Sequence, residues 1–225
     1  MLKTYDEMQV QLIRSTEDPG HIIRLASDLT QKKETSGKGA SEELIKFLIT
    51  ANHTSLLEHI TTTWLIKDVS RSFLAQITRH RMASYTSASQ HYQDYRDYPN
   101  IVDKSMDNSL TDNQFVAIDA AYVEHINKGV PAQEARQILP NAKAVNILWT
   151  INVRSLINFL NLRLCYRNVN EMRIFANKVH DKCMLWWPEV FDHIGPDCMM
   201  LGKCRQGRMM AQICKDNGSP WTKPI

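Results

Sequence analysis

The stretch AVNILWTINVRSLINFLNLR, residues 144–163, decides the fold because its hydrophobic period changes partway along. Apolar side chains alternate over residues 145–151, which is the spacing of a β-strand. The residues that follow have helical spacing: Arg154, Asn158 and Asn161 recur at i, i+4 and i+7, opposite an apolar face. This stretch therefore predicts a strand that runs directly into a helix.

Strands and helices are predicted on both sides of this stretch. The segment HITTTWLIK, residues 59–67, alternates and is rich in β-branched and aromatic residues, and residues 8–13 also alternate. Helices are predicted at residues 21–29, from Ser41, from Ser70 to residue 77, and at residues 113–128, 131–140 and 170–187. Loop-like composition is found near residues 30–40, 96–111 and 195–225. This order of elements predicts the α+β (mixed α/β) class.

Composition indicates a folded globular protein. The 225 residues are 43% hydrophobic and 23% charged with only 8 Gly, and no domain boundary is evident, so one domain over residues 1–225 is expected. The sequence has no apolar run of transmembrane length and does not begin like a signal peptide, so a cytoplasmic location is expected. Net charge is only +3, which counts against a protein that coats nucleic acid or membrane.

The five cysteines include no CxxC pair, so a disulfide framework is not expected. Cys198, Cys204 and Cys214 lie in the tail, residues 196–225, at spacings that could hold a metal. A fourth ligand is not evident, and His193 is only loosely placed. We therefore expect no metal, although the role of these three cysteines stays open.

The densest polar segment is QITRHRMASYTSASQHY, residues 76–92. It combines Arg79, His80 and Arg81 with a run of hydroxyl and amide side chains, a mixture suited to phosphate and heterocycle recognition. A solvated basic helix end, favoured by the helix dipole, is an equally simple interpretation. The sequence contains no GxGxxG, Walker or GxSxG motif, so Rossmann, nucleotide triphosphatase and serine hydrolase functions have no support.

A second polar group consists of Asn152, Arg154, Asn158 and Arg163. A helix that opens directly from a strand presents its free amides to an anion, and here an arginine lies in the first turn. These side chains could instead be the solvated face of an amphipathic helix. The apolar character of the rest of the segment weakens that alternative, because polar groups on a buried helix need partners.

Read in order, these segments resemble the flavin-dependent thymidylate synthases. The family signature is RHR, then seven residues, then Ser, and RHRMASYTSAS fits it at residues 79–89. Further landmarks follow the family order: HTSLLEHI at 53–60, Gln76, PAQEARQILP at 131–140 and TINVRSLINFLNLR at 150–163. The resemblance covers residues 40–185.

The resemblance implies the thymidylate synthase-complementing protein fold, with a central mixed sheet flanked by helices, in a homotetramer that binds FAD at subunit interfaces. It implies methylation of dUMP at C5 to dTMP with 5,10-methylenetetrahydrofolate and NADPH. The matching nucleotide-binding residues are Gln76, Ile77, Thr78, Arg79, Ser87, Ala88, Ser89, Gln90, His91, Arg136 and Arg163. The matching FAD-binding residues are Arg79, His80, Arg81, Ser87, Asn152, Val153, Arg154 and Asn158, with Ser55 from another subunit.

Arg163 is the expected catalytic residue. Uracil C5 becomes nucleophilic when negative charge develops at N3 and O4, so a guanidinium beside the pyrimidine stabilises the activated state most. The family needs no covalent enzyme nucleophile, so Ser89 is expected to bind the nucleotide and not to attack it.

Several positions depart from the commonest family pattern. His91 stands where many members have Arg, Thr86 and Ser87 replace an Asn-Glu pair, and Arg167 stands at a position that is often His. Methylation or hydroxymethylation of UMP or dCMP therefore stays open. A nucleic-acid-binding module that uses TRHR and KCRQGR would bind with steep salt dependence, but the near-neutral charge counts against it.

Overall fold

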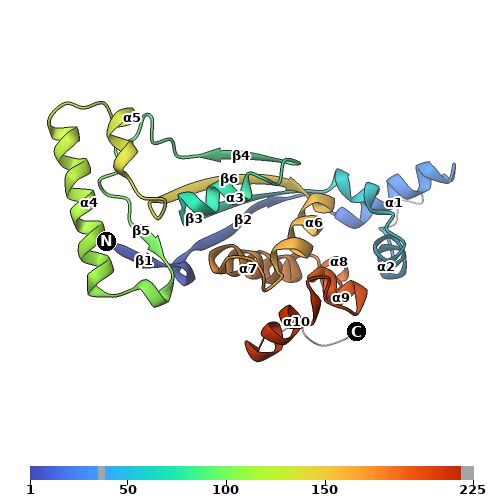
Figure 1. Cartoon of the computed structure of the whole chain (residues 1–225). Helices are drawn as coiled ribbons and strands as arrows, with labels where there is room; N and C mark the ends of the chain where they lie inside the picture. Colours follow the sequence, from blue (N-terminus) through green and yellow to red (C-terminus); the bar gives the residue numbers. More distant parts are fainter. Residues whose placement is uncertain (35–38, 219–225) are drawn as a thin grey trace. The chain divides into compact units, whose positions relative to one another are not determined.

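The computed structural model describes residues 1–34 and 39–218 and confirms the mixed α/β class (Figure 1). The strands are β1 Leu2–Thr4, β2 Gln9–Ser15, β3 Thr61–Ser70, β4 Ala83–Ser87, β5 Asn100–Val102 and β6 Ala144–Asn152. The helices are α1 Pro19–Thr30, α2 Glu42–Thr50, α3 Arg71–Ile77, α4 Ser109–Asn127, α5 Ala132–Ala135, α6 Val153–Arg163, α7 Asn170–Trp186, α8 Pro188–Phe191, α9 Asp197–Leu201 and α10 Gly207–Asp216. The 3-10 helices are η1 Tyr5–Glu7, η2 Thr54–His59, η3 Lys104–Met106 and η4 Arg136–Ile138.

Four strands form one sheet in the order β2-β3-β6-β4, while β1 and β5 form a separate parallel pair. The central strands β3 and β6 are antiparallel. The Thr62 hydroxyl donates to the Ile151 carbonyl at 3.2 Å, and the Thr63 and Thr150 hydroxyls lie 3.0 Å apart, so the numbers on one strand rise as those on the other fall. Parallel pairing is found between β1 and β5, from Leu2 with Asn100 to Thr4 with Val102.

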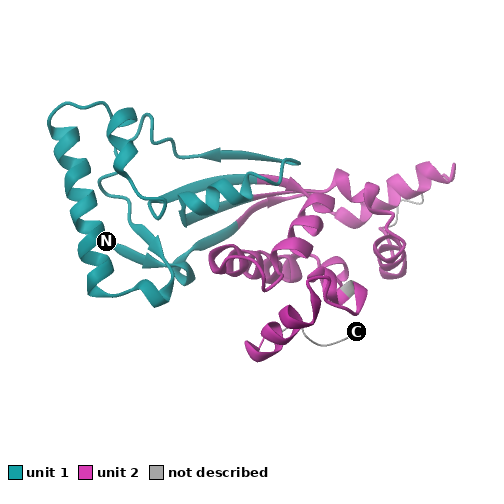
Figure 2. Ribbon diagram, viewed as in Figure 1, with its two compact units in different colours: residues 1–11, 64–149 teal, residues 12–63, 150–225 magenta. Residues whose placement is uncertain are grey.

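The described chain divides into two compact units, and the unit boundaries fall within β2, β3 and β6 (Figure 2). Unit 1 contains residues 1–11 and 64–149. Its core includes Trp64 and Trp149, both fully buried, with ring centroids 6.5 Å apart. The alternation that predicted β3 and β6 thus places one side of each strand in this core. Whether residues 1–225 form a single domain stays a prediction.

Unit 2 comprises residues 12–63 together with those from 150 onward. Its core is built on α6 and α7, whose Phe159 and Phe175 rings meet edge to face at 5.8 Å. Asn152 caps α6, because its side chain accepts a hydrogen bond from the Ser155 amide at 2.8 Å. The predicted passage from strand β6 to helix α6 is confirmed, with this cap at the junction.

The helices predicted to begin at Ser41 and Ser70 are confirmed, and each serine caps its helix. Ser41 and Ser70 accept hydrogen bonds from the amides three residues ahead, at 3.3 and 3.0 Å. Gly129 has φ of 81°, the left-handed conformation that follows the end of α4.

The loop prediction for residues 195–225 is wrong over part of its length, because α9 and α10 lie there. In α10, Met210, Ile213 and Cys214 recur at helical spacing, but Gly and Lys on either side obscured this pattern. Residues 219–225 lie outside the described part. No helix of the described ranges is long and apolar enough to span a membrane.

Candidate active site

The RHR segment, residues 79–81, forms the turn between α3 and β4 in unit 1. The amide of Arg79 donates to the Gln76 carbonyl at 3.2 Å, and the amide of His80 donates to the Ile77 carbonyl at 3.0 Å. These bonds to the third preceding residue tighten the helix end into a 3-10 turn. The three ionisable residues therefore follow α3 at a defined backbone turn.

Hydrogen bonds from the Tyr85 hydroxyl hold this turn in place. Its phenolic oxygen lies 2.8 Å from the Ile77 carbonyl and 2.8 Å from the His80 carbonyl, so its one proton is shared between two acceptors. Burial raises the pKa of Tyr85 to about 12, and the side chain of Trp149 partly offsets that rise. The hydroxyl therefore remains a donor at neutral pH and ties β4 to the RHR turn.

The arginines of this turn are available to an anion. Arg79 and Arg81 are exposed, and within the described ranges their guanidinium groups make no hydrogen bond or ion pair. Arg136, also exposed, donates from Nε to the Gln133 carbonyl at 3.0 Å and keeps its other donors for a ligand. Guanidinium donors of this kind suit phosphate oxygens.

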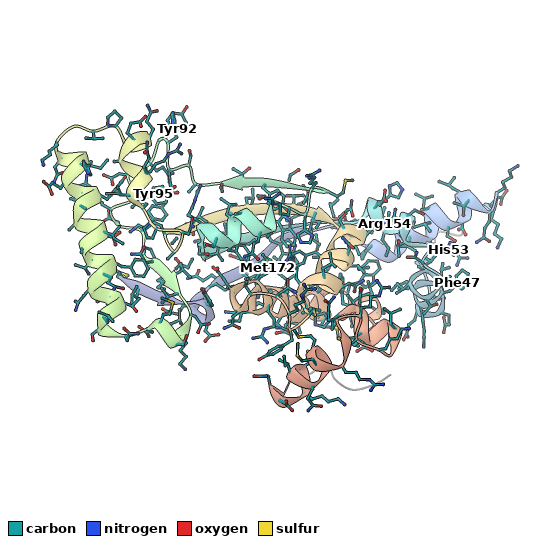
Figure 3. All side chains as sticks on the ribbon, in the orientation of Figure 1. Phe47, His53, Tyr92, Tyr95, Arg154 and Met172 are labelled. Atoms are coloured by element: carbon teal, nitrogen blue, oxygen red, sulfur yellow. The ribbon has the colours of Figure 1, made fainter. Side chains whose placement is uncertain are left out.

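Residues 87–91 continue from the end of β4. The Ala88 amide donates to the Asn146 carbonyl at 3.2 Å, and the Tyr95 hydroxyl donates to the Ala88 carbonyl at 3.1 Å. Tyr95 is fully buried, and Figure 3 labels its position. The Ser89 side chain accepts from the amide of His91 at 3.2 Å, and His91 itself is exposed. The loop is therefore anchored at Ala88 and open towards His91.

At the start of α6 in unit 2, two of the predicted residues have structural roles. Asn152 caps the helix, and buried Val153 donates its amide to the Ile60 carbonyl at 2.8 Å. Arg154 and Asn158 are exposed one helical turn apart. The sequence therefore predicted a polar face on this helix but could not separate the capping residue from the exposed side chains.

Arg154 forms an ion pair with Glu58 of η2, and both side chains are about half exposed. Ser55 lies exposed on the same short helix, which packs against α6. Figure 3 labels Arg154 and also His53, the residue that precedes η2. The pairing of Glu58 with Arg154 spans 96 residues, so no local sequence pattern predicts it.

Arg163 ends α6 and is partly buried. Its Nη1 donates to Asn168 Oδ1 at 2.9 Å, while Asn168 Nδ2 donates to the carbonyls of Leu162 and Cys165 at 2.7 and 3.1 Å. Burial lowers the pKa of the guanidinium, which stays charged at neutral pH and would be stabilised by an anion bound beside it. Asn168 is thus a supporting residue that the sequence did not reveal.

The predicted residues are divided between the two units. Unit 1 holds Gln76, Ile77, Thr78, Arg79, His80, Arg81, Ser87, Ala88, Ser89, Gln90, His91 and Arg136. Unit 2 holds Ser55, Asn152, Val153, Arg154, Asn158 and Arg163. Each set includes cationic side chains and hydrogen-bonding groups.

Comparison with known sequences gives one consistent result. The sequence model of the family described as thymidylate synthase complementing protein matches residues 11–189, more than the resemblance had covered. The flavin-dependent thymidylate synthase of Geobacter sulfurreducens is 33% identical over 216 residues, covering 90% of this chain and 93% of that protein. The enzyme of the same name from Sulfolobus acidocaldarius is 32% identical, covering 86% and 79%.

Two solved structures have a similar fold. A UMP/dUMP methylase, PolB from Streptomyces cacaoi bound with 5-Br dUMP, has a TM-score of 0.72 at 19% identity, covering 85% of this chain and 95% of that one. Flavin-dependent thymidylate synthase ThyX from Helicobacter pylori, complexed with FAD and dUMP, has a TM-score of 0.70 at 22% identity, covering 83% and 99%.

Proposed function

The chain belongs to the family of flavin-dependent thymidylate synthases, and we propose that it methylates dUMP at C5 to give dTMP. In this proposal 5,10-methylenetetrahydrofolate donates the carbon and NADPH is the reductant. The observation that carries the proposal is the RHR turn, where Tyr85 fixes the backbone while Arg79 and Arg81 have no partner among the described residues.

The side chains present fit FAD. Its diphosphate needs several cationic donors in the absence of a Gly-rich phosphate loop, and Arg79, Arg81 and Arg154 are exposed guanidinium groups. We propose that FAD is held by Ser55, Arg79, His80, Arg81, Ser87, Asn152, Val153, Arg154 and Asn158. Asn152 and Val153 would contribute chiefly by positioning the start of α6. When bound, FAD supplies the hydride chemistry that protein side chains lack.

The nucleotide would be held by the end of α3, the loop after β4 and two further arginines. The proposed residues are Gln76, Ile77, Thr78, Arg79, Ser87, Ala88, Ser89, Gln90, His91, Arg136 and Arg163. Arg163 would face the pyrimidine and stabilise the negative charge that develops when C5 becomes nucleophilic. Asn168 holds the Arg163 guanidinium in one orientation, which lowers the cost of reorganisation during reaction.

We further propose a homotetramer, with FAD at interfaces between subunits and Ser55 contributed by another subunit, in the cytoplasm. The division of the site residues into two groups is compatible with an active site completed by more than one chain. A single domain over residues 1–225 remains part of this proposal.

The proposed cofactor is tested by reconstitution. Purified protein incubated with FAD and desalted should keep flavin absorbance, and Arg79→Ala should weaken binding because a charge-assisted phosphate contact is lost. The matched control is Arg14→Ala, which removes an exposed arginine that belongs to neither group of site residues. Protein that remains colourless after incubation with FAD would contradict the proposal.

Tyr85→Phe should raise the FAD dissociation constant by up to about tenfold, since a hydrogen bond contributes about 0.5–1.5 kcal/mol. The physical reason is that the variant loses the hydroxyl that holds the RHR turn but keeps the ring. Flavin fluorescence titration measures the change. Tyr98→Phe, which removes a hydroxyl bonded to Gln93 Oε1, is the control and should bind FAD as the unmodified protein does. Equal affinities for both variants would show that Tyr85 does not position the turn.

His91→Arg should lower the nucleotide KM above neutral pH and change it little under acidic conditions. Histidine is the side chain type whose charge varies near neutrality, whereas arginine is always charged. Steady-state kinetics across pH measure this effect. The same KM in both proteins at every pH would show that His91 does not contact the phosphate.

A second substrate stays within the proposal because of Thr86, Ser87 and His91. Methylation or hydroxymethylation of UMP or dCMP would use the same arginines for the phosphate, which all these nucleotides carry. The nucleic-acid-binding alternative is not favoured, because the net charge of the chain is only +3.

A further inference from the structure

A cavity of about 640 Å³ lies at the end of α6, and all its lining residues belong to unit 2, which is magenta in Figure 2. Arg163 lines this cavity, and so does Arg167 from the segment that joins α6 to α7. The other walls come from α9, α10 and the segment between them. A volume of this size is typical of small-molecule sites. The cavity can therefore hold the pyrimidine that Arg163 is proposed to face.

Two arginines of this cavity are each held by a neutral amide side chain. Arg163 Nη1 donates to Asn168 Oδ1 at 2.9 Å, and Arg167 Nη1 donates to Gln206 Oε1. A hydrogen bond to a neutral amide orients a guanidinium without neutralising its charge. Arg167 is exposed, and across residues 1–34 and 39–218 it forms no ion pair. Its positive charge is therefore available to a ligand.

The cavity has an excess of positive charge. Among the lining residues that the structure describes, the one acid is Asp197, which pairs with Arg205 at 3.5 Å. The cationic lining residues are Arg163, Arg167, Lys203, Arg205 and Lys215. Positive charges around a bound ligand favour its anionic form. The cavity is therefore suited to a ligand that becomes negatively charged during reaction.

The pairing of Arg167 with Gln206 does not follow from the family resemblance. Arg167 stands at a position that is often His, and Gln206 lies beyond residues 11–189, which the family model matches. The tail that contains Gln206 nevertheless lines the same cavity as Arg163. Only the fold brings Arg167 and Gln206 together, across 39 residues.

We propose that Arg167 is a second guanidinium that contacts the pyrimidine in the site of Arg163, with Gln206 as its positioning residue. This inference rests on the proposed function. When C5 becomes nucleophilic, negative charge spreads over N3 and the carbonyl oxygens on either side of it. One planar guanidinium pairs with N3 and one of these oxygens, so a second guanidinium can stabilise the charge on the other oxygen. Arginine stays protonated throughout and removes no proton itself.

Binding of 5-fluoro-dUMP tests the inference without turnover. Fluorine at C5 lowers the pKa of N3, so at mildly alkaline pH this ligand loses its N3 proton to solvent more readily than dUMP does. Flavin-loaded unmodified protein should therefore bind it more tightly than dUMP. Arg167→Ala should reduce this preference by about tenfold, because a hydrogen bond from a charged donor is lost. Calorimetric titration measures both affinities.

The matched control is Arg208→Ala, which removes an exposed arginine of α10 that does not line the cavity. This variant should keep the preference of the unmodified protein for 5-fluoro-dUMP. Gln206→Ala should reduce the preference in the same direction as Arg167→Ala, because the guanidinium loses the acceptor that orients it. An unchanged preference in Gln206→Ala would show that Gln206 is not a positioning residue.

The pH dependence of Arg167→His gives a readout that a purely structural role would not change. Histidine loses its charge near neutrality, so kcat/KM for dUMP in this variant should fall by about tenfold relative to the unmodified protein as the pH rises from acidic to alkaline. Arg167→Lys stays charged over this range and should show no such fall. The other titratable lining groups are the same in all three proteins, so their effects cancel: Cys165, Tyr166, Asp197, Cys198, Lys203, Cys204, Cys214 and Lys215.

Three results would overturn the inference. The unmodified protein could show no preference for 5-fluoro-dUMP at alkaline pH, a result that does not depend on whether any variant folds. Arg167→Ala could keep the full preference, or Arg167→His and Arg167→Lys could share one pH profile. Any of these in a protein that methylates dUMP would reject the role of Arg167 and leave the proposed function intact. A protein that neither binds nor methylates dUMP would contradict both.

Discussion

Arg163→Ala is expected to lower kcat for dUMP methylation by about 100- to 1,000-fold, the usual cost of removing one donor that stabilises developing negative charge. Arg163 ends α6, is partly buried and is held at Nη1 by Asn168. Alanine keeps the helix but leaves no cation to stabilise charge on the pyrimidine. Steady-state and single-turnover kinetics with flavin-loaded protein measure the effect.

The control for this prediction is Arg173→Ala, because Arg173 packs its guanidinium over the Tyr166 ring at 3.8 Å in the same unit. It removes the same type of side chain outside the proposed site and should leave kcat within a small factor. If Arg163→Ala binds FAD, folds normally and turns over dUMP at the unmodified rate, Arg163 is not the catalytic residue.

Asp119→Ala should destabilise the protein by about 3–5 kcal/mol, the typical cost of breaking a buried ion pair from one side. Lys143 has no exposed side-chain surface, and its Nζ lies 2.7 Å from Asp119 Oδ1. Asn100 Nδ2 donates to the other carboxylate oxygen at 2.9 Å. The variant would leave a buried ammonium and an amide without this acceptor. Denaturant unfolding measures the loss.

The same α4 helix offers a control in Glu124→Ala. Glu124 pairs with Lys128 on the helix surface, where solvent screens the charges, so stability should barely change. Equal losses of stability for both variants would show that burial does not decide the effect.

The buried pair also bears on the site, because the Lys143 carbonyl accepts a hydrogen bond from the amide of Arg71, the first residue of α3. Destabilising Lys143 therefore loosens the helix that leads into the RHR turn.

Much of the fold was predictable because its strongest signals are local. Alternation identified β2, β3 and β6, and a capping serine marked the start of α2 and of α3. The tail was mispredicted because α9 is short and α10 carries its apolar residues among Gly and Lys. The separate pairing of β1 with β5 depends on contacts about 98 residues apart, which no local pattern encodes.

Sequence reasoning could propose candidate site residues where they stand next to one another in the chain. The RHR segment and the polar face of α6 were found from composition and spacing, and family resemblance gave them roles. Their supporting contacts were not found, because Glu58 reaches Arg154 only through tertiary packing and Tyr85 reaches its acceptors only once the turn has formed.

Release of tritium from C5-labelled dUMP is the most direct test of the proposed activity, because methylation at C5 replaces that hydrogen. Flavin-loaded protein with 5,10-methylenetetrahydrofolate and NADPH should release tritium to water from dUMP, and Arg163→Ala should nearly abolish the release. C5-labelled UMP and dCMP are assayed in parallel under the same conditions. Release from UMP or dCMP without release from dUMP would contradict the assignment to dUMP, and release from none of the three would contradict C5 methylation altogether.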